Sequence, residues 1–171
     1  MEKVIILGTK AREIIDIDAN KVITMLNKAY ANEWLAHYQY WIGAKIVTGP
    51  MRKLAAYELN EHAEEELDHA ERIAERIIQL GGTPLLSPQD WYNETSCGYK
   101  TPNDSTVVRL IEQNLEGERC AIDDYQTLLN NVKDKDPITY DLILDILDTE
   151  LEHEEDLQSI LEDIEVMKKK V

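Results

Sequence analysis

Glycine and proline divide this sequence at three places, and these breaks restrict what the chain can fold into. Gly49 and Pro50 form the first break, and Asp136-Pro137 forms the third. Between them, residues 83–104 contain three of the five prolines. Because both residue types disrupt the interior of a helix, four long segments remain, at residues 18–48, 51–80, 105–133 and 136–170. Residues 1–17 form an N-terminal extension, and residues 83–104 form a long loop.

Each of the four segments repeats apolar residues at the three- and four-residue spacing of an amphipathic helix. Leu110, Ile111 and Leu115 show this pattern in the third segment. Asp18 and Asp136 are suitable N-cap residues for the first and fourth segments. Four long helices joined by a short, a long and a short connection predict an all-α four-helix bundle. The one long crossover joins the second and third helices, and we expect a single domain over residues 1–171.

The charge of the chain predicts a cation-binding protein. It has 34 acidic and 18 basic residues, a formal net charge of −16. Such a charge attracts cations and repels nucleic acid and anionic membranes, so we expect metal ions as partners and neither nucleic acid nor membrane. No apolar run approaches the roughly 18 residues of a membrane-spanning helix, and the apolar residues 4–7 are too few for a signal peptide. We therefore expect a cytoplasmic protein.

Two of the four histidines follow a glutamate by three positions. Glu66 and His69 lie in the second segment, and Glu150 and His153 lie in the fourth. Residues three apart share one face of a helix, so each pair can bind one ion. The two histidines are 84 positions apart, which places the pairs at matching positions in an internal repeat.

One glutamate in each of the other two segments completes the set. Glu33 precedes Glu66 by 33 positions, and Glu116 precedes Glu150 by 34. Four carboxylates inside a bundle are costly unless cations compensate their charge, and two divalent ions would do so. Oxygen ligands with one imidazole per ion suit Fe(II) or Mn(II). The sequence therefore predicts a two-metal site formed by Glu33, Glu66, His69, Glu116, Glu150 and His153.

The stretches that carry these residues are NEWLAHYQYWIGAK, EEELDHAERI, NLEGERCAIDDY and TELEHEEDL. They resemble the bacterioferritin-type di-iron site, and the whole chain resembles the Dps-like proteins called thioferritins, within the ferritin-like superfamily. The resemblance implies a ferritin-like bundle, two Fe per subunit and a homo-oligomeric, dodecameric cage. It also implies a ferroxidase that oxidises Fe(II) with hydrogen peroxide or dioxygen, stores the iron and protects against oxidative stress.

Two departures refine the resemblance. Leu67 stands where bacterioferritins carry the haem-binding methionine, directly after the second glutamate ligand, so we expect no haem. We also expect no fifth helix after the fourth, which favours a twelve-subunit shell.

Three further residues are candidates to take part in the reaction. Tyr40, seven positions after Glu33, resembles the bacterioferritin tyrosine near the di-iron site. Cys120 lies one turn beyond Glu116 on the same helix face. The resemblance pairs it with Cys97 from the long loop, SCGYK, and whether the two form a disulfide or act in redox chemistry stays open.

The roles of His37 and Glu112 also stay open, and we expect three neighbouring residues to face solvent or the inner surface of the cage: His62, Glu64 and Glu65. Two other functions fit the same sequence. One is a di-manganese catalase or peroxidase, in which the metals cycle and nothing is stored. The other is a non-enzymatic helical assembly or DNA-binding module, in which the acidic residues only solvate the surface.

Overall fold

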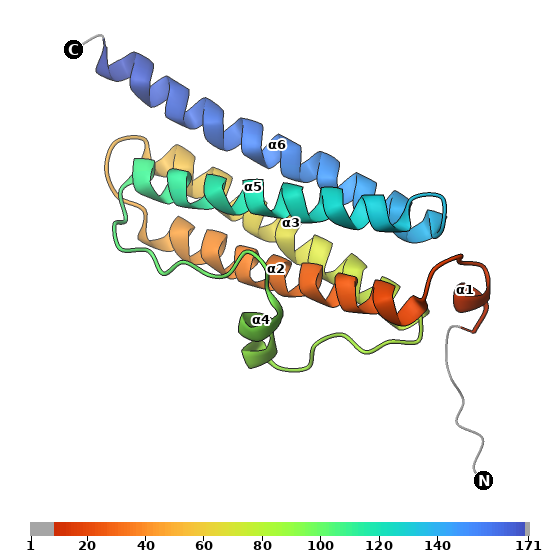
Figure 1. Cartoon of the computed structure of the whole chain (residues 1–171). Coiled ribbons are helices and arrows are strands. Elements are labelled where there is room, and N and C mark those ends of the chain that lie inside the picture. Colours follow the sequence, from red (N-terminus) through yellow and green to blue (C-terminus); the bar gives the residue numbers. More distant parts are fainter. Residues whose placement is uncertain (1–8, 170–171) are drawn as a thin grey trace.

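The computed structural model describes residues 9–169, and its regular secondary structure is helical (Figure 1). Its six helices are α1 (Thr9–Glu13), α2 (Ala19–Ile46), α3 (Arg52–Gln79), α4 (Pro88–Glu94), α5 (Val107–Val132) and α6 (Pro137–Lys168). The four long helices α2, α3, α5 and α6 lie side by side as a bundle, and α4 interrupts the crossover from α3 to α5. The predicted all-α four-helix bundle with one long crossover is thereby confirmed. The expectation about residues 4–7 lies outside the described residues.

The turns between the long helices follow from the residues that break them. Gly49 and Met51 both have positive φ, 98° and 63°, which reverses the chain between α2 and α3. Asp18 caps α2 by accepting the backbone N–H of Asn20 at 2.9 Å, and Asp136 caps α6 ahead of Pro137. No helix in the part of the chain that the structure describes is both long and apolar enough to span a membrane.

The apolar core is interrupted halfway along the bundle. One cluster of buried residues includes Leu26, Ile77 and Ile143, and a second includes Leu59 and Ile111. Along each long helix, buried polar residues separate the two clusters, and the ionisable ones are Glu33, Glu66, His69, Glu118, Glu150 and His153. The two apolar clusters thus enclose a layer of ionisable side chains between them.

The crossover loop is attached to the middle of the bundle. Cys97 in the loop forms a disulfide with Cys120 of α5, with a Cα–Cα distance of 5.7 Å, so the two cysteines that the resemblance pairs are joined. Trp91 of α4 stacks on Trp34 of α2 with ring centroids 4.8 Å apart. Asn32 of α2 accepts hydrogen bonds from the loop, including the backbone N–H of Ser96 at 3.2 Å. These contacts fix the loop beside the layer of ionisable residues.

A buried ion pair joins α3 to the start of α6. The Arg76 guanidinium donates to both carboxylate oxygens of Asp136, at 2.8 and 3.0 Å, and to the Thr139 hydroxyl at 2.8 Å. Asp136 also accepts the backbone N–H of Thr139 at 3.0 Å. The side chains of Arg76 and Asp136 are at most 4% exposed, so neither charge is compensated by water.

Replacing Asp136 with alanine is expected to lower the free energy of unfolding by about 3–5 kcal/mol, because Arg76 is left as an unpaired buried charge. Asp18→Ala is the matched control, since it also removes an N-cap but at an exposed helix start, and should cost about 1 kcal/mol. Chemical denaturation of the two variants at equal protein concentration measures the difference. Equal losses for the two variants would contradict a structural role for the buried pair.

Candidate metal centre

Six ionisable side chains from the four long helices meet in the middle of the bundle. Glu33 comes from α2, Glu66 and His69 from α3, Glu118 from α5, and Glu150 and His153 from α6. None of these residues is more than 3% exposed. Five of them belong to the set predicted from the sequence, and Glu118 is the sixth.

The six side chains form two overlapping groups, each around one histidine. The His69 Nδ1 atom lies 3.2 Å from Glu33, 3.5 Å from Glu66 and 3.2 Å from Glu150. In the second group, the His153 Nδ1 atom lies 3.5 Å from Glu66 and 3.3 Å from Glu150. Glu118 completes this second group at 3.8 Å from the same Nδ1 atom. Glu66 and Glu150 belong to both groups and are therefore placed to bridge two ions.

These distances fit the coordination of divalent metal ions. Ligand atoms about 2.1 Å from one ion lie about 3.4 Å from each other in a tetrahedral arrangement and about 3.0 Å in an octahedral one. Both carboxylate oxygens of Glu150 and the Nδ1 atom of His153 are buried without a hydrogen-bond partner. Such atoms are costly unless a ligand satisfies them. Carboxylate oxygens with one imidazole for each ion suit Fe(II) or Mn(II).

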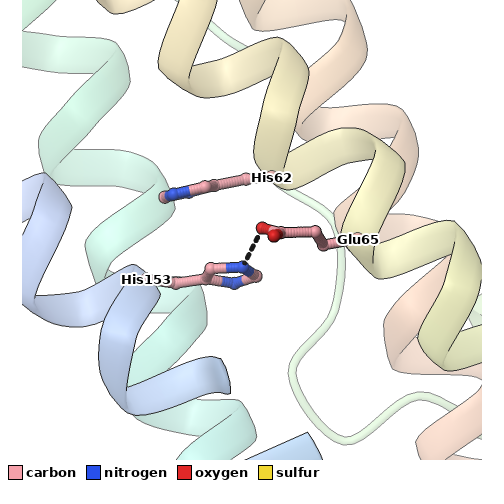
Figure 2. A group of neighbouring side chains, drawn as sticks. All are labelled: His62, Glu65 and His153. Atoms are coloured by element: carbon pink, nitrogen blue, oxygen red, sulfur yellow. Dashed lines mark hydrogen bonds and ion pairs between the residues drawn. The ribbon is translucent and has the colours of Figure 1, made fainter.

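Three neighbouring side chains hold these residues in position. The Tyr40 hydroxyl donates to Glu118, and the Tyr125 hydroxyl donates to Glu33 at 2.5 Å. The His153 Nε2 atom lies 2.8 Å from a carboxylate oxygen of Glu65 (Figure 2). Donation of the Nε2 hydrogen to Glu65 leaves Nδ1 free to act as a ligand, as is usual for metal-binding histidines.

The prediction for Glu116 is wrong. Its side chain is 64% exposed and forms an ion pair with Lys100 of the crossover loop. Residues two apart are separated by about 200° around a helix, so Glu116 points away from the bundle while Glu118 points into it. The side chain that α5 contributes to the buried group is therefore that of Glu118.

A signal for Glu118 is present in the sequence. Glu33 precedes Tyr40 by seven positions, and Glu118 precedes Tyr125 by the same seven. The distance in sequence to the next Glu-x-x-His pair does not distinguish Glu116 from Glu118. Glu116 precedes Glu150 by 34 positions and Glu118 precedes it by 32, and both numbers differ by one from the 33 positions of the first half. In the structure, each tyrosine donates a hydrogen bond to the glutamate of the other half, Tyr40 to Glu118 and Tyr125 to Glu33.

His62, His37 and Glu112 lie outside the group of six side chains. His62 is 2% exposed, so the expectation that it faces solvent is wrong; its ring stacks on His153 with centroids 4.0 Å apart. His37 contacts the backbone carbonyl of Ala63 at 2.6 Å. Glu112 forms an ion pair with Arg109 and does not orient a histidine of the centre.

A small cavity of about 30 Å³ leads from the disulfide toward the carboxylates. Cys97 and Gly98 of the loop line one side of it, and Gly117 of α5 lines another. Glu33 and Glu118 also line the cavity. A space of this size accommodates about one water molecule, so this side of the bundle offers an approach to the centre for a small molecule.

The centre is electrostatically coupled. Burial, together with the neighbouring carboxylates, raises the pKa of Glu33 and of Glu118 well above the ordinary value. Burial disfavours a charged His69, but the nearby carboxylates of Glu150, Glu33 and Glu66 outweigh it and raise the pKa of His69 to about 12. Without metal, the centre therefore holds protons at neutral pH, and a metal ion that uses the same atoms must displace them.

Comparisons with known proteins identify relatives of this chain. A family model described as a ferritin-like domain matches residues 23–167. A DNA protection during starvation protein of Pyrococcus furiosus is 35% identical over 147 residues, covering 85% of this chain and 79% of that protein. The solved structure of a dodecameric thioferritin, the bacterioferritin-related protein from Bacteroides fragilis, is 45% identical, with a TM-score of 0.89 and 94% of each chain covered.

A more distant structure, Dps from Thermosynechococcus elongatus, has the same fold with 20% identity and a TM-score of 0.80, covering 90% of this chain and 95% of that one. The resemblance to thioferritins and Dps-like proteins inferred from the four ligand stretches is thereby confirmed.

In the metal-free protein, the free energy of unfolding should fall as pH rises from about 7 to 9. A raised pKa for His69 contributes stability that is complete below its unfolded value of 6.5 and is lost as pH rises toward about 12. The raised pKa of Glu33 and Glu118 acts in the same direction. For each proton that the folded state retains and the unfolded state has lost, the free energy of unfolding falls by about 1.4 kcal/mol per pH unit.

Urea denaturation between pH 7 and 9 measures this slope, and saturating Co(II) should remove it because the ion replaces the protons. Glu116→Gln, which alters an exposed carboxylate, should leave the slope unchanged. A metal-free protein whose stability does not change over this range would contradict the proton-holding centre.

Proposed function

Since the chain belongs to the ferritin-like family, we propose that it is a ferroxidase and iron-storage protein that oxidises Fe(II) at an intrasubunit two-metal centre. The observation that carries the proposal is the set of six buried ligands, in which Glu66 and Glu150 are shared between two groups. Two Fe(II) ions, the substrate, would occupy these groups. Four carboxylates would balance the charge of the two ions.

The arrangement suits a two-electron oxidant. Hydrogen peroxide takes one electron from each of two Fe(II) ions and, with two protons, yields two Fe(III) and two water molecules. Holding both ions in one centre couples the two electron transfers and avoids release of a one-electron product such as hydroxyl radical. Dioxygen is the alternative oxidant. The cavity beside Cys97 and Gly98, which holds about one water molecule, marks the side from which either molecule would reach the centre.

Several residues around the ligands have supporting roles in this proposal. Tyr40 and Tyr125 position Glu118 and Glu33 through their hydroxyls, and Glu65 orients His153. Cys97 lines the approach to the centre, and its disulfide with Cys120 holds the crossover loop there; the redox role of the two cysteines stays a proposal. The absence of haem, predicted from Leu67, also stays a prediction.

We extend the proposal to storage in a homo-oligomeric cage of twelve subunits, with protection from oxidative stress as its result. The support is the similarity to the dodecameric thioferritin, 45% identical over almost the whole of both chains. The net charge of −16 also favours the accumulation of Fe(II) around the protein. Manganese suits the same ligands, so a di-manganese catalase or peroxidase is the alternative.

Glu118→Gln is expected to lower the initial rate of Fe(II) oxidation by at least about 100-fold, because loss of a ligand should cost more than loss of the groups that orient ligands. The rate is measured with two Fe(II) per subunit and either peroxide or dioxygen, from the appearance of Fe(III) absorbance and, for peroxide, from its consumption. Glu116→Gln removes an equal charge two residues away and should retain the wild-type rate.

If Glu118→Gln were as active as wild type and Glu116→Gln were inactive, Glu116 would be the ligand. That result would contradict the assignment of Glu118 to the centre. A wild-type protein that oxidises no Fe(II) but decomposes peroxide when loaded with Mn(II) would favour the catalase alternative.

A further inference from the structure

Beside the two-metal centre, α3 and α6 bring three more potential ligands together on the side of the bundle that reaches solvent. Glu58 and His62 come from α3, one turn apart, and Asp156 comes from α6. The side chain of Asp156 is 53% exposed and that of Glu58 is 20% exposed, whereas His62 is only 2% exposed. The group therefore extends from the buried centre to the surface.

His62 has no hydrogen-bond partner that explains its burial. Its Nδ1 atom is buried without a partner. Its Nε2 atom faces the two carboxylates, 3.5 Å from Glu58 and 3.7 Å from Asp156. These separations exceed the usual length of a hydrogen bond, roughly 2.7–3.2 Å. A buried imidazole nitrogen without a partner at hydrogen-bonding distance is costly, so the position of Nε2 between the two carboxylates calls for a ligand there.

The separations match two ligands of one metal ion. An ion about 2.1 Å from each ligand atom holds tetrahedral neighbours about 3.4 Å apart, which is close to the two distances from Nε2. We propose that Glu58, His62 and Asp156 form a third metal site, which takes a divalent first-row transition metal ion. One imidazole with two carboxylates is the same class of donor set as each half of the two-metal centre.

The third site is directly connected to the two-metal centre. The rings of His62 and His153 stack with centroids 4.0 Å apart, and Glu65 lies beside both, with its carboxylate on the His153 Nε2 atom (Figure 2). An ion on the Nε2 atom of His62 therefore neighbours the second half of the centre across a single pair of rings. That this ion is Fe(II) in the cell rests on the proposed function, whereas the site itself does not.

Anomalous diffraction tests the site in crystals of the full-length, assembled protein soaked anaerobically with Co(II) alone and measured at the cobalt edge. Three peaks are expected in each subunit, two among the six ligands of the centre and one between Glu58, His62 and Asp156. Two peaks in the centre and none at the third position would overturn the third site and leave the proposed function intact. A peak at the third position without peaks in the centre would contradict the proposed function and support the third site.

A Glu58→Gln/Asp156→Asn double variant keeps the shape of the site and leaves buried His62 in place. It should lose the third peak and keep the other two. The matched control is Glu61→Gln/Glu155→Gln, which removes two exposed carboxylates from the same helices and should keep all three peaks. A third peak that persists in the first double variant at undiminished occupancy would overturn the assignment of these ligands.

Discussion

Six ionisable side chains buried at the middle of a narrow helical bundle are the constraint on which this structure depends. Water cannot compensate their charge there, because apolar clusters close the bundle above and below them. Protons and mutual hydrogen bonds compensate it in the metal-free protein, and two divalent ions can replace the protons. The cost of burying these groups explains why each helix must be long enough to carry apolar residues on both sides of its ligands.

The internal repeat of the chain has a physical consequence at this centre. Equivalent positions in the two halves supply Glu33 and Glu118, and the tyrosine of each half donates to the glutamate of the other. Neither half therefore completes the centre alone. The crosswise contacts tie α2 to α5 at the layer of ionisable side chains between the two apolar clusters.

The two halves are nevertheless not equivalent. His153 donates to Glu65 and stacks on His62, whereas Thr149 occupies the position of Glu65 in the second half. The crossover loop adds a second difference, because the disulfide and Trp91 attach it to one side of the bundle. One half of the centre is thus linked to the surface through α3 and α6, and the small cavity opens between α2 and α5.

The sequence by itself determined the bundle, its single long crossover and five of the six side chains that meet at the centre, because helix breakers, apolar spacing and the Glu-x-x-His pairs are local patterns. Only the tertiary structure decided between Glu116 and Glu118, which differ by about half a turn of helix rotation, and only it showed that His62 is buried. Both depend on how α3 and α5 rotate against their neighbours. That rotation is set by side-chain packing across the whole bundle, which no single segment of the sequence encodes.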